Sequence, residues 1–182
     1  MDRLSLIIVL YLLISVSVGA VDFTEAKAQA EQGDAWYQTE LALMHHNGTG
    51  MPKDYAKAIE WYRKAADQGF AKAQANLGVM YAEGEGMPQD FSIAVSWFRK
   101  AAYQGNSLAQ HNLGLMYGRG QGVPQDYTEA YAWESLAAIS GHEDAIKNRD
   151  NIASNFSPEE LNTAQRTTKR LFLKIKHNKA KQ

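Results

Sequence analysis

The sequence predicts an all-α protein, an α/α solenoid of three 36-residue helix-turn-helix repeats with capping helices at both ends. Glycine recurs at an interval of 36 residues, at Gly33, Gly69, Gly105 and Gly141. Tryptophan keeps the same interval, at Trp61, Trp97 and Trp133. A fixed period of about 20 to 50 residues is typical of repeat proteins, in which each unit buries its apolar face against the next.

The chain opens with an apolar leader and then a short helix. Residues 4–21 carry no charge and end in small side chains, so we predict that residues 1–20 are a signal peptide. An uncleaved membrane anchor is the alternative. Residues 21–33 are predicted to form an N-terminal capping half-repeat, because "DFTEA" at 22–26 resembles "DYAKA" at 54–58 but reaches its glycine four residues sooner.

Residues 34–141 are predicted to hold the three repeats, each made of a helix A and a helix B. In the second repeat helix A covers 71–83, because its apolar residues recur at helical spacing. These residues are Ala73, Leu77, Met80 and Tyr81. Gly78 and Gly114 lie within this apolar stripe, where glycine costs about 1 kcal/mol relative to alanine. We therefore expect a neighbouring helix to approach closely at both glycines.

The segment "GEGMPQD" is predicted to reverse the chain between the two helices. Gly84 ends helix A in the left-handed conformation, Pro88 prevents the helix from continuing, and Asp90 caps helix B. Helix B stops before Gly105, and the sequence places its large aromatic residues, Trp97 included, in the core. The expected buried side consists of Phe91, Ala94, Trp97, Phe98, Ala101 and Ala102.

Residues 142–182 are predicted to form C-terminal capping helices with a basic tail. A helix over 142–153 takes the place of a fourth helix A. "SPEE" at 157–160 then starts a last helix with a capping box and a proline at its first position. The expected apolar face of this helix consists of Leu161, Ala164, Thr168, Leu171, Phe172 and Ile175.

Charge is distributed unevenly between the body and the tail. Residues 21–144 contain 9 basic and 16 acidic side chains, a net charge of −7, whereas residues 145–182 contain 9 basic and 3 acidic ones, a net charge of +6. The tail can be a cap whose lysines face solvent, or it can contact an anionic surface of the cell envelope. Both interpretations remain open. Nucleic acid is not an expected partner of an exported chain.

Several motifs resemble reactive sites but are better explained as structure. "GRGQG" at 118–122 follows a helix, and Asp126 after it would repel phosphate. "SGHEDA" at 140–145 lacks the second histidine of a zinc helix, because Ile146 stands at that position. The chain has no cysteine, so it has no disulfide or thiolate site. We predict no enzymatic activity, no cofactor and no metal site.

The pattern "AxAQxNLGxMYxxGxGxPxD[FY]" at 71–91, followed by "AxxW[FY]RKAA" at 94–102, resembles the Sel-one-like repeat family, whose repeats are related to tetratricopeptide repeats. The resemblance implies a right-handed solenoid whose concave face is lined by helix A of each repeat. It also implies a non-enzymatic adaptor or scaffold, and an exported bacterial member of the family is expected in the periplasm. Secretion, or anchoring by an uncleaved leader, is the alternative location.

The predicted binding surface is the outward side of helix A, where a partner protein or peptide is expected to bind. One row consists of positions 36, 72 and 108, a second of 43, 79 and 115, and a third of Thr39, Ala75 and His111. The candidate partner-binding residues are Trp36, Leu43, Lys72, Val79, Leu108, His111 and Leu115. Half-burial of the second row against the next repeat is the alternative. The alternative function is regulation of an envelope enzyme or binding of a cell-wall ligand.

Overall fold

The computed structural model describes residues 22–181, which form nine α-helices and no strand. The predicted signal peptide lies outside the described residues. Within them, no helix has the length and apolar character needed to cross a membrane. The helices are α2 (Phe23–Glu31), α3 (Ala35–Asn47), α4 (Tyr55–Asp67), α5 (Ala71–Glu83), α6 (Phe91–Ala102), α7 (Ser107–Arg119), α8 (Tyr127–Ile139), α9 (Glu143–Ser154) and α10 (Pro158–Lys179).

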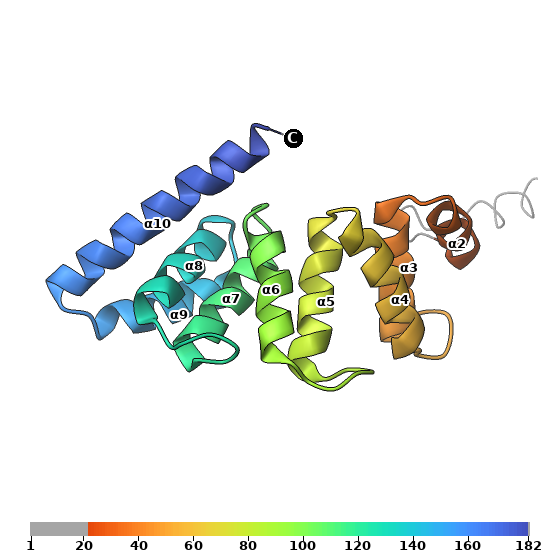
Figure 1. Ribbon diagram of the computed structural model, residues 1–182, viewed down its shortest axis with the longest axis horizontal. Helices are drawn as coiled ribbons and strands as arrows, with labels where there is room; N and C mark the ends of the chain where they lie inside the picture. The colour runs from red at the N-terminus through yellow and green to blue at the C-terminus, as the bar shows by residue number, and fades with distance from the viewer. Residues whose placement is uncertain (1–21, 182) are drawn as a thin grey trace, which may run out of the picture.

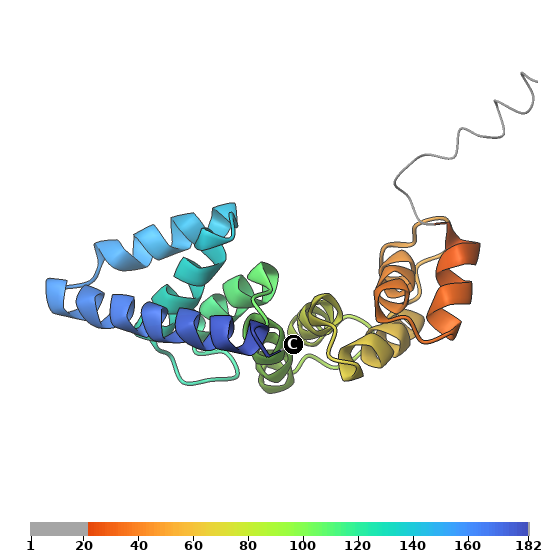
Figure 2. The same ribbon diagram turned by 90° about the horizontal axis from the view of Figure 1, so that it is seen from above.

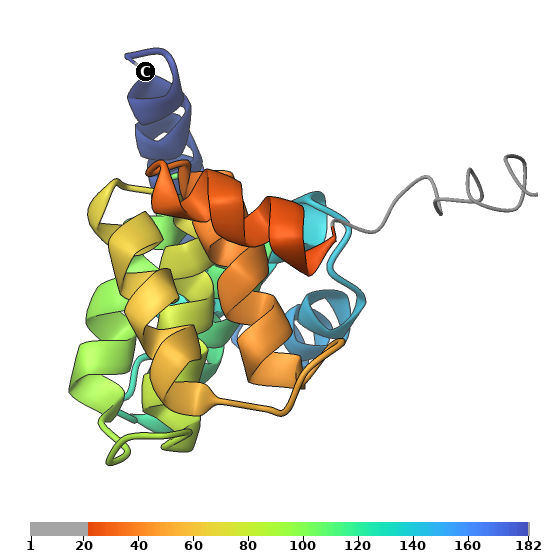
Figure 3. The same ribbon diagram turned by 90° about the vertical axis from the view of Figure 1, so that its right-hand side faces the viewer.

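The helices stack in chain order as antiparallel pairs, α3 with α4, α5 with α6, and α7 with α8 (Figure 1). The stack forms an arc with α3, α5, α7 and α9 on its inner side (Figure 2). Viewed from the end at which α2 lies, the successive pairs lie behind one another (Figure 3). The predicted all-α repeat solenoid is confirmed.

The turn inside each repeat is fixed by a glycine and an aspartate, as the sequence predicts. Gly84 ends α5 with φ = 72°, in the left-handed region, and its N–H donates to the Met80 carbonyl at 2.9 Å. Asp90 accepts from the Ile93 N–H at 2.9 Å and so caps α6. The end of α5 and the start of α6 therefore lie where Gly84 and Asp90 place them.

Helix A and helix B of one repeat approach each other closely at the predicted glycines. A Cβ on Gly78 would lie 2.6 Å from the Phe98 ring, and one on Gly114 would lie 2.8 Å from Cγ of Glu134. Real Cβ atoms do not tolerate such contacts, so only glycine fits at these two positions. The expected close approach is confirmed.

Trp97 packs against the edge of the core, and does not lie inside it as predicted. Trp97 is only partly buried, and the Lys100 ammonium lies 3.9 Å from the centre of its ring. Phe98 is fully buried in its place, because helix B turns position 98 rather than position 97 toward helix A. Among the three tryptophans that recur, Trp133 is the buried one, with 2% of its surface exposed.

Buried glutamines link successive repeats, a feature that the sequence analysis did not identify. The amides of Gln38, Gln74 and Gln110 donate to the carbonyls of Ala30, Ala66 and Ala102, at 3.1, 3.0 and 3.2 Å. Gln68 donates to the side-chain oxygen of Gln38, and Gln104 to that of Gln74, both at 2.8 Å. These residues also recur every 36 positions, so the signal was present in the sequence.

We expect Gly78→Ala to lower the free energy of unfolding by about 1–3 kcal/mol, because the added methyl group overpacks the contact with Phe98. Gly118→Ala is the matched control. Its Cβ would meet the nearest atom at 3.7 Å, an ordinary contact, so this variant should gain up to about 1 kcal/mol of helix propensity. Urea unfolding measures both changes. Equal effects of the two substitutions would contradict the packing at Gly78.

Candidate binding surfaces

The first row of predicted binding residues is exposed, on helices that lie along the inner side of the arc. Trp36 on α3 is 42% exposed and Leu108 on α7 is 37% exposed. Lys72 stands between them on α5, and its ammonium pairs with Glu40 at 2.6 Å. This ion pair joins two successive repeats on the same surface. The row therefore presents an indole and an isobutyl group on either side of a charged pair.

The second row is half-buried. Leu43, Val79 and Leu115 each show only part of their side chains, and Val79 packs against the core of the second and third repeats. Leu115 also lines a hollow of about 140 Å³ between α7, α8 and α9, together with Asn148 and Ile152. The alternative of half-burial therefore describes this row, although Leu115 stays accessible from the hollow. We use the name inner surface for Trp36, Leu43, Lys72, Val79, Leu108 and Leu115.

The third row does not face outward. Thr39 and Ala75 are fully buried, because helix A turns this position into the packed interior. His111, the third member, is partly buried and engaged by its neighbours. Its Nδ1 lies 2.9 Å from Oε2 of Glu134, and its ring stacks on His142 with 4.3 Å between the ring centres. The structure thus places His111 in a polar cluster instead of the inner surface.

The centre of this polar cluster is Glu134, which is 1% exposed. Its Oε1 accepts from Asn148 at 2.9 Å, while Oε2 meets His111, so both carboxylate oxygens have partners. In the earlier repeats the same position holds Tyr62 and Phe98. Tyr62 makes the equivalent bond through its hydroxyl, 3.2 Å from the Asn76 amide, and burial raises the pKa of this phenol. A carboxylate at an aromatic position was the signal that the sequence analysis missed.

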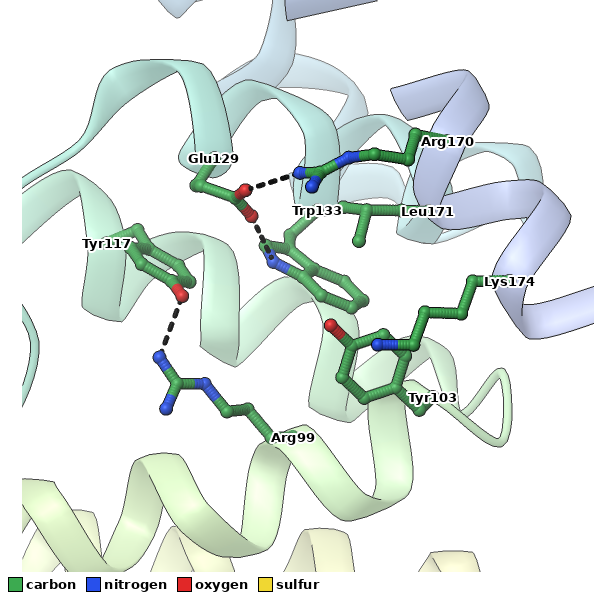
Figure 4. Close-up of a pocket in the computed structure, with 8 residues that line it drawn as sticks. All are labelled: Arg99, Tyr103, Tyr117, Glu129, Trp133, Arg170, Leu171 and Lys174. Carbon is green, nitrogen blue, oxygen red and sulfur yellow. Dashed lines mark hydrogen bonds and ion pairs between the residues drawn. The ribbon is translucent and has the colours of Figure 1, made fainter. Parts of the chain in front are cut away.

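A second cavity, of about 260 Å³, lies where α10 packs against α8 (Figure 4). At its edge, the Glu129 carboxylate accepts from the Trp133 indole N–H at 3.0 Å and from Arg170 at 3.1 Å. The Lys174 ammonium lies 4.3 Å from the centre of the Tyr103 ring. These contacts cover Trp133 and explain why it is more buried than its counterparts.

One part of the expected apolar face of α10 is wrong. Ala164, Leu171 and Ile175 are buried as predicted, but Phe172 is 45% exposed. Each residue of an α-helix is rotated by about 100° from the one before it, so Phe172 is turned away from the side that contains Leu171. Leu173, with 54% exposure, lies further round the helix.

The acidic and histidine side chains of residues 22–181 are not grouped in the way that a metal site requires. No group of three or more His, Cys, Asp or Glu side chains there is placed to hold an ion. The adjacent histidines have separate surroundings: Nε2 of His46 lies 2.7 Å from Glu85, whereas His45 is buried.

His45 occupies the position that holds Tyr81 and Tyr117 in the later repeats. It is 6% exposed, and its Nδ1 has no hydrogen-bond partner among the described residues. Burial, and to a lesser degree the nearby Lys57 ammonium, lowers the pKa of His45 below its ordinary value of 6.5. The folded chain therefore binds a proton at this site less readily than the unfolded chain does.

These features define a helical-repeat protein with an arc-shaped inner surface. The family model of the Sel1 repeat matches residues 37–70, 71–106 and 107–142, which together make up more than half of the chain. The chain therefore belongs to the Sel1 repeat family. Members of this family are generally protein-interaction modules and typically non-enzymatic scaffolds.

Solved structures share the fold. A protective antigen of uropathogenic Escherichia coli with an SLR fold is 42% identical (TM-score 0.66), over 69% of this chain and 27% of the antigen. A Sel1 repeat protein from Oxalobacter formigenes is 39% identical, over 71% and 98% of the two chains (TM-score 0.65). Cysteine rich protein B of Helicobacter pylori, 21% identical over 71% and 97% (TM-score 0.58), shares the fold alone. Thus the matched region spans about a quarter of the E. coli antigen. The comparison with curated proteins gave no match.

We expect Leu171→Ala to lower the free energy of unfolding by about 2–5 kcal/mol, because it leaves a cavity between α10 and α8. Leu173→Ala, two residues away on the exposed side of the same helix, should change it by less than about 0.5 kcal/mol. Thermal or urea unfolding distinguishes the two. If Leu171→Ala proved as mild as Leu173→Ala, the packing of Leu171 between α10 and α8 would be contradicted.

The stability of the protein should fall as the pH drops below about 6.5, because the unfolded chain takes up a proton at His45 that the folded chain resists. His45→Tyr, which restores the residue of the later repeats, should remove this part of the pH dependence. Chemical unfolding of both proteins at about pH 7.5 and at about pH 5.5 measures the difference. An identical loss of stability in both proteins would exclude His45 as its source.

Proposed function

We propose that the chain is a non-enzymatic adaptor that holds a partner protein or peptide on its inner surface. The observation that carries the proposal is the exposure of Trp36 and Leu108, two large apolar side chains at equivalent positions of α3 and α7. Tryptophan in particular is frequent among the residues that dominate protein–protein affinity. The family's general role as an interaction module supports the same conclusion.

The chemistry of the surface defines the kind of partner. Apolar groups at Trp36, Leu108 and the hollow beside Leu115 can accept the apolar side chains of a peptide. Between them, the Lys72–Glu40 pair and the Asn112 amide provide polar contacts along the row. A segment with spaced apolar residues, in a helix or an extended chain, would match this alternation.

The proposed place of action is the periplasm, reached through the leader at residues 1–20. Its support is the uncharged run that ends in small residues. Secretion or anchoring by an uncleaved leader are the other outcomes. Mass analysis of the N-terminus of the protein recovered from cells would distinguish cleavage from retention.

We expect a partner to be captured by cross-linking from the envelope fraction with the wild-type protein and lost with the double variant Trp36→Glu, Leu108→Glu. The matched control is Ile93→Glu, Ile139→Glu, which adds the same charge at apolar residues of α6 and α8 that are 39% and 67% exposed. Circular dichroism verifies that each variant folds. A partner retained by the Trp36 and Leu108 variant, or lost equally with the control, would overturn the proposed site.

A further inference from the structure

One face of α10 is left uncovered by the other helices of residues 22–181. The helix packs on α8 through Leu171 and Ile175, which are 4% and 7% exposed. Residue 173 is rotated by about 200° from residue 171, so it points to the opposite side. We name this side the α10 outer face. It consists of Arg166, Lys169, Phe172, Leu173 and Lys176.

The α10 outer face combines exposed apolar groups with unneutralised positive charge. Phe172 and Leu173 are 45% and 54% exposed. The lysines and the arginine around them are exposed and take part in no ion pair within the described part of the chain. The acidic residues of the helix, Glu159 and Glu160, lie in its first turn. These adjacent phenylalanine and leucine side chains therefore leave about half of their surface open to solvent.

The position of α10 leaves this face free for a large ligand. Figure 2 shows α9 and α10 on opposite sides of α8, with α10 along the outer side of the arc. The helix has 22 residues and runs back along the stack to Gly105, where Lys179 meets the end of the second repeat. The outer face is therefore long, and its occupation does not block the inner surface.

We propose that the α10 outer face docks on an anionic phospholipid surface. In the docked position the cations of this face lie level with the lipid phosphates, and each basic residue close to such a surface strengthens binding. Phe172 and Leu173, in the middle of these cations, enter the boundary between headgroups and acyl chains, as in helices that lie in a membrane interface. The body of the chain carries a net charge of −7 over residues 21–144 and is repelled, so α10 meets the surface first.

The apolar pair distinguishes lipid from a purely charged partner. A polyanion such as a cell-wall polymer is attracted by the lysines and the arginine alone. A lipid surface has an apolar layer beneath its charges and also uses Phe172 and Leu173. Binding to lipid vesicles that requires both kinds of residue therefore supports the lipid surface and excludes a purely electrostatic contact.

The test is co-sedimentation of the purified protein with vesicles of phosphatidylcholine alone, and with vesicles of equal parts phosphatidylcholine and phosphatidylglycerol. We expect stronger binding to the anionic vesicles than to the neutral ones, and we expect this difference to shrink at higher ionic strength. Lys169→Glu, Lys176→Glu should lower the partition coefficient at least about 25-fold, roughly fivefold for each lysine lost. Phe172→Ser, Leu173→Ser should lower it about tenfold or more.

The matched control is Lys27→Glu, Lys57→Glu, which makes the same charge change on α2 and α4. It should bind within about twofold of the wild type, because its lysines lie outside the region where the surface potential acts. Lys169→Arg, Lys176→Arg should retain binding. Any contribution of residues 1–21 is common to all variants, and circular dichroism verifies their folding.

Four results would overturn the proposal. Equal binding to neutral and anionic vesicles would show an interaction that does not use the cations. Full binding by the Phe172 and Leu173 variant would indicate a purely electrostatic contact, such as that with a polymer. An equal loss in the control would make net charge the cause. The fourth result is that the lipid-free protein forms salt-sensitive oligomers and that the Phe172 and Leu173 variant does not. The α10 outer face would then be an interface between copies of the chain.

Discussion

Every repeat depends on a buried hydrogen bond that joins it to the preceding unit. A buried polar group that is left without a partner costs about 1–3 kcal/mol, so a buried glutamine amide favours the position in which it is paired. Gln74 donates to the Ala66 carbonyl, which also accepts from the Gly69 N–H, and Gln74 accepts from Gln104. Each helix A is therefore held in one register against the helix B before it. Within a repeat, Gly78 meets the Phe98 ring and Gly114 meets the Glu134 side chain. The register between repeats sets which side of helix A remains on the inner surface.

The residues that end and cap the helices could be predicted from the sequence, but side-chain environments could be predicted only in part. Gly84, Pro88 and Asp90 act on their own backbone, so the bounds of α5 and α6 follow from the residues themselves. The burial of Ala75 and the partial exposure of Trp97 depend instead on where the neighbouring helices lie. Helical periodicity gives the direction of a side chain within a helix, but not which neighbour lies in that direction. The exposure of Trp36 and Leu108 could be predicted because no other helix within residues 22–181 covers that row.

The third repeat departs from the other two at the positions that receive the C-terminal helices. Glu134 replaces an aromatic residue and binds Asn148 of α9, while Glu129 replaces Ile93 and binds Arg170 of α10. Ser140 stands 36 residues after Gln104, where the next glutamine of the Gln68 and Gln104 series would be, and the Oε1 atom of Gln110 has no partner among the described residues. The hydrogen bonds between buried glutamines thus end at this repeat, and polar pairs orient the next helices instead. Buried apolar residues of α10 then provide the area that stabilises the end of the stack.

The rotation of α10 about its own axis decides what its charges can do. A basic helix beside an acidic body could neutralise that body. Among the basic residues of α10, however, only Arg170 forms an ion pair with another helix within residues 22–181. Leu171 and Ile175 anchor the helix by their burial, which is worth about 1.5–3 kcal/mol for each side chain, whereas an exposed ion pair is worth at most about 1 kcal/mol. Packing therefore determines the rotation, and Lys169 and Lys176 are carried to the far side together with Leu173. The same apolar contacts that close the solenoid thus separate its positive charge from its inner surface, so that one chain presents two chemically different faces at once.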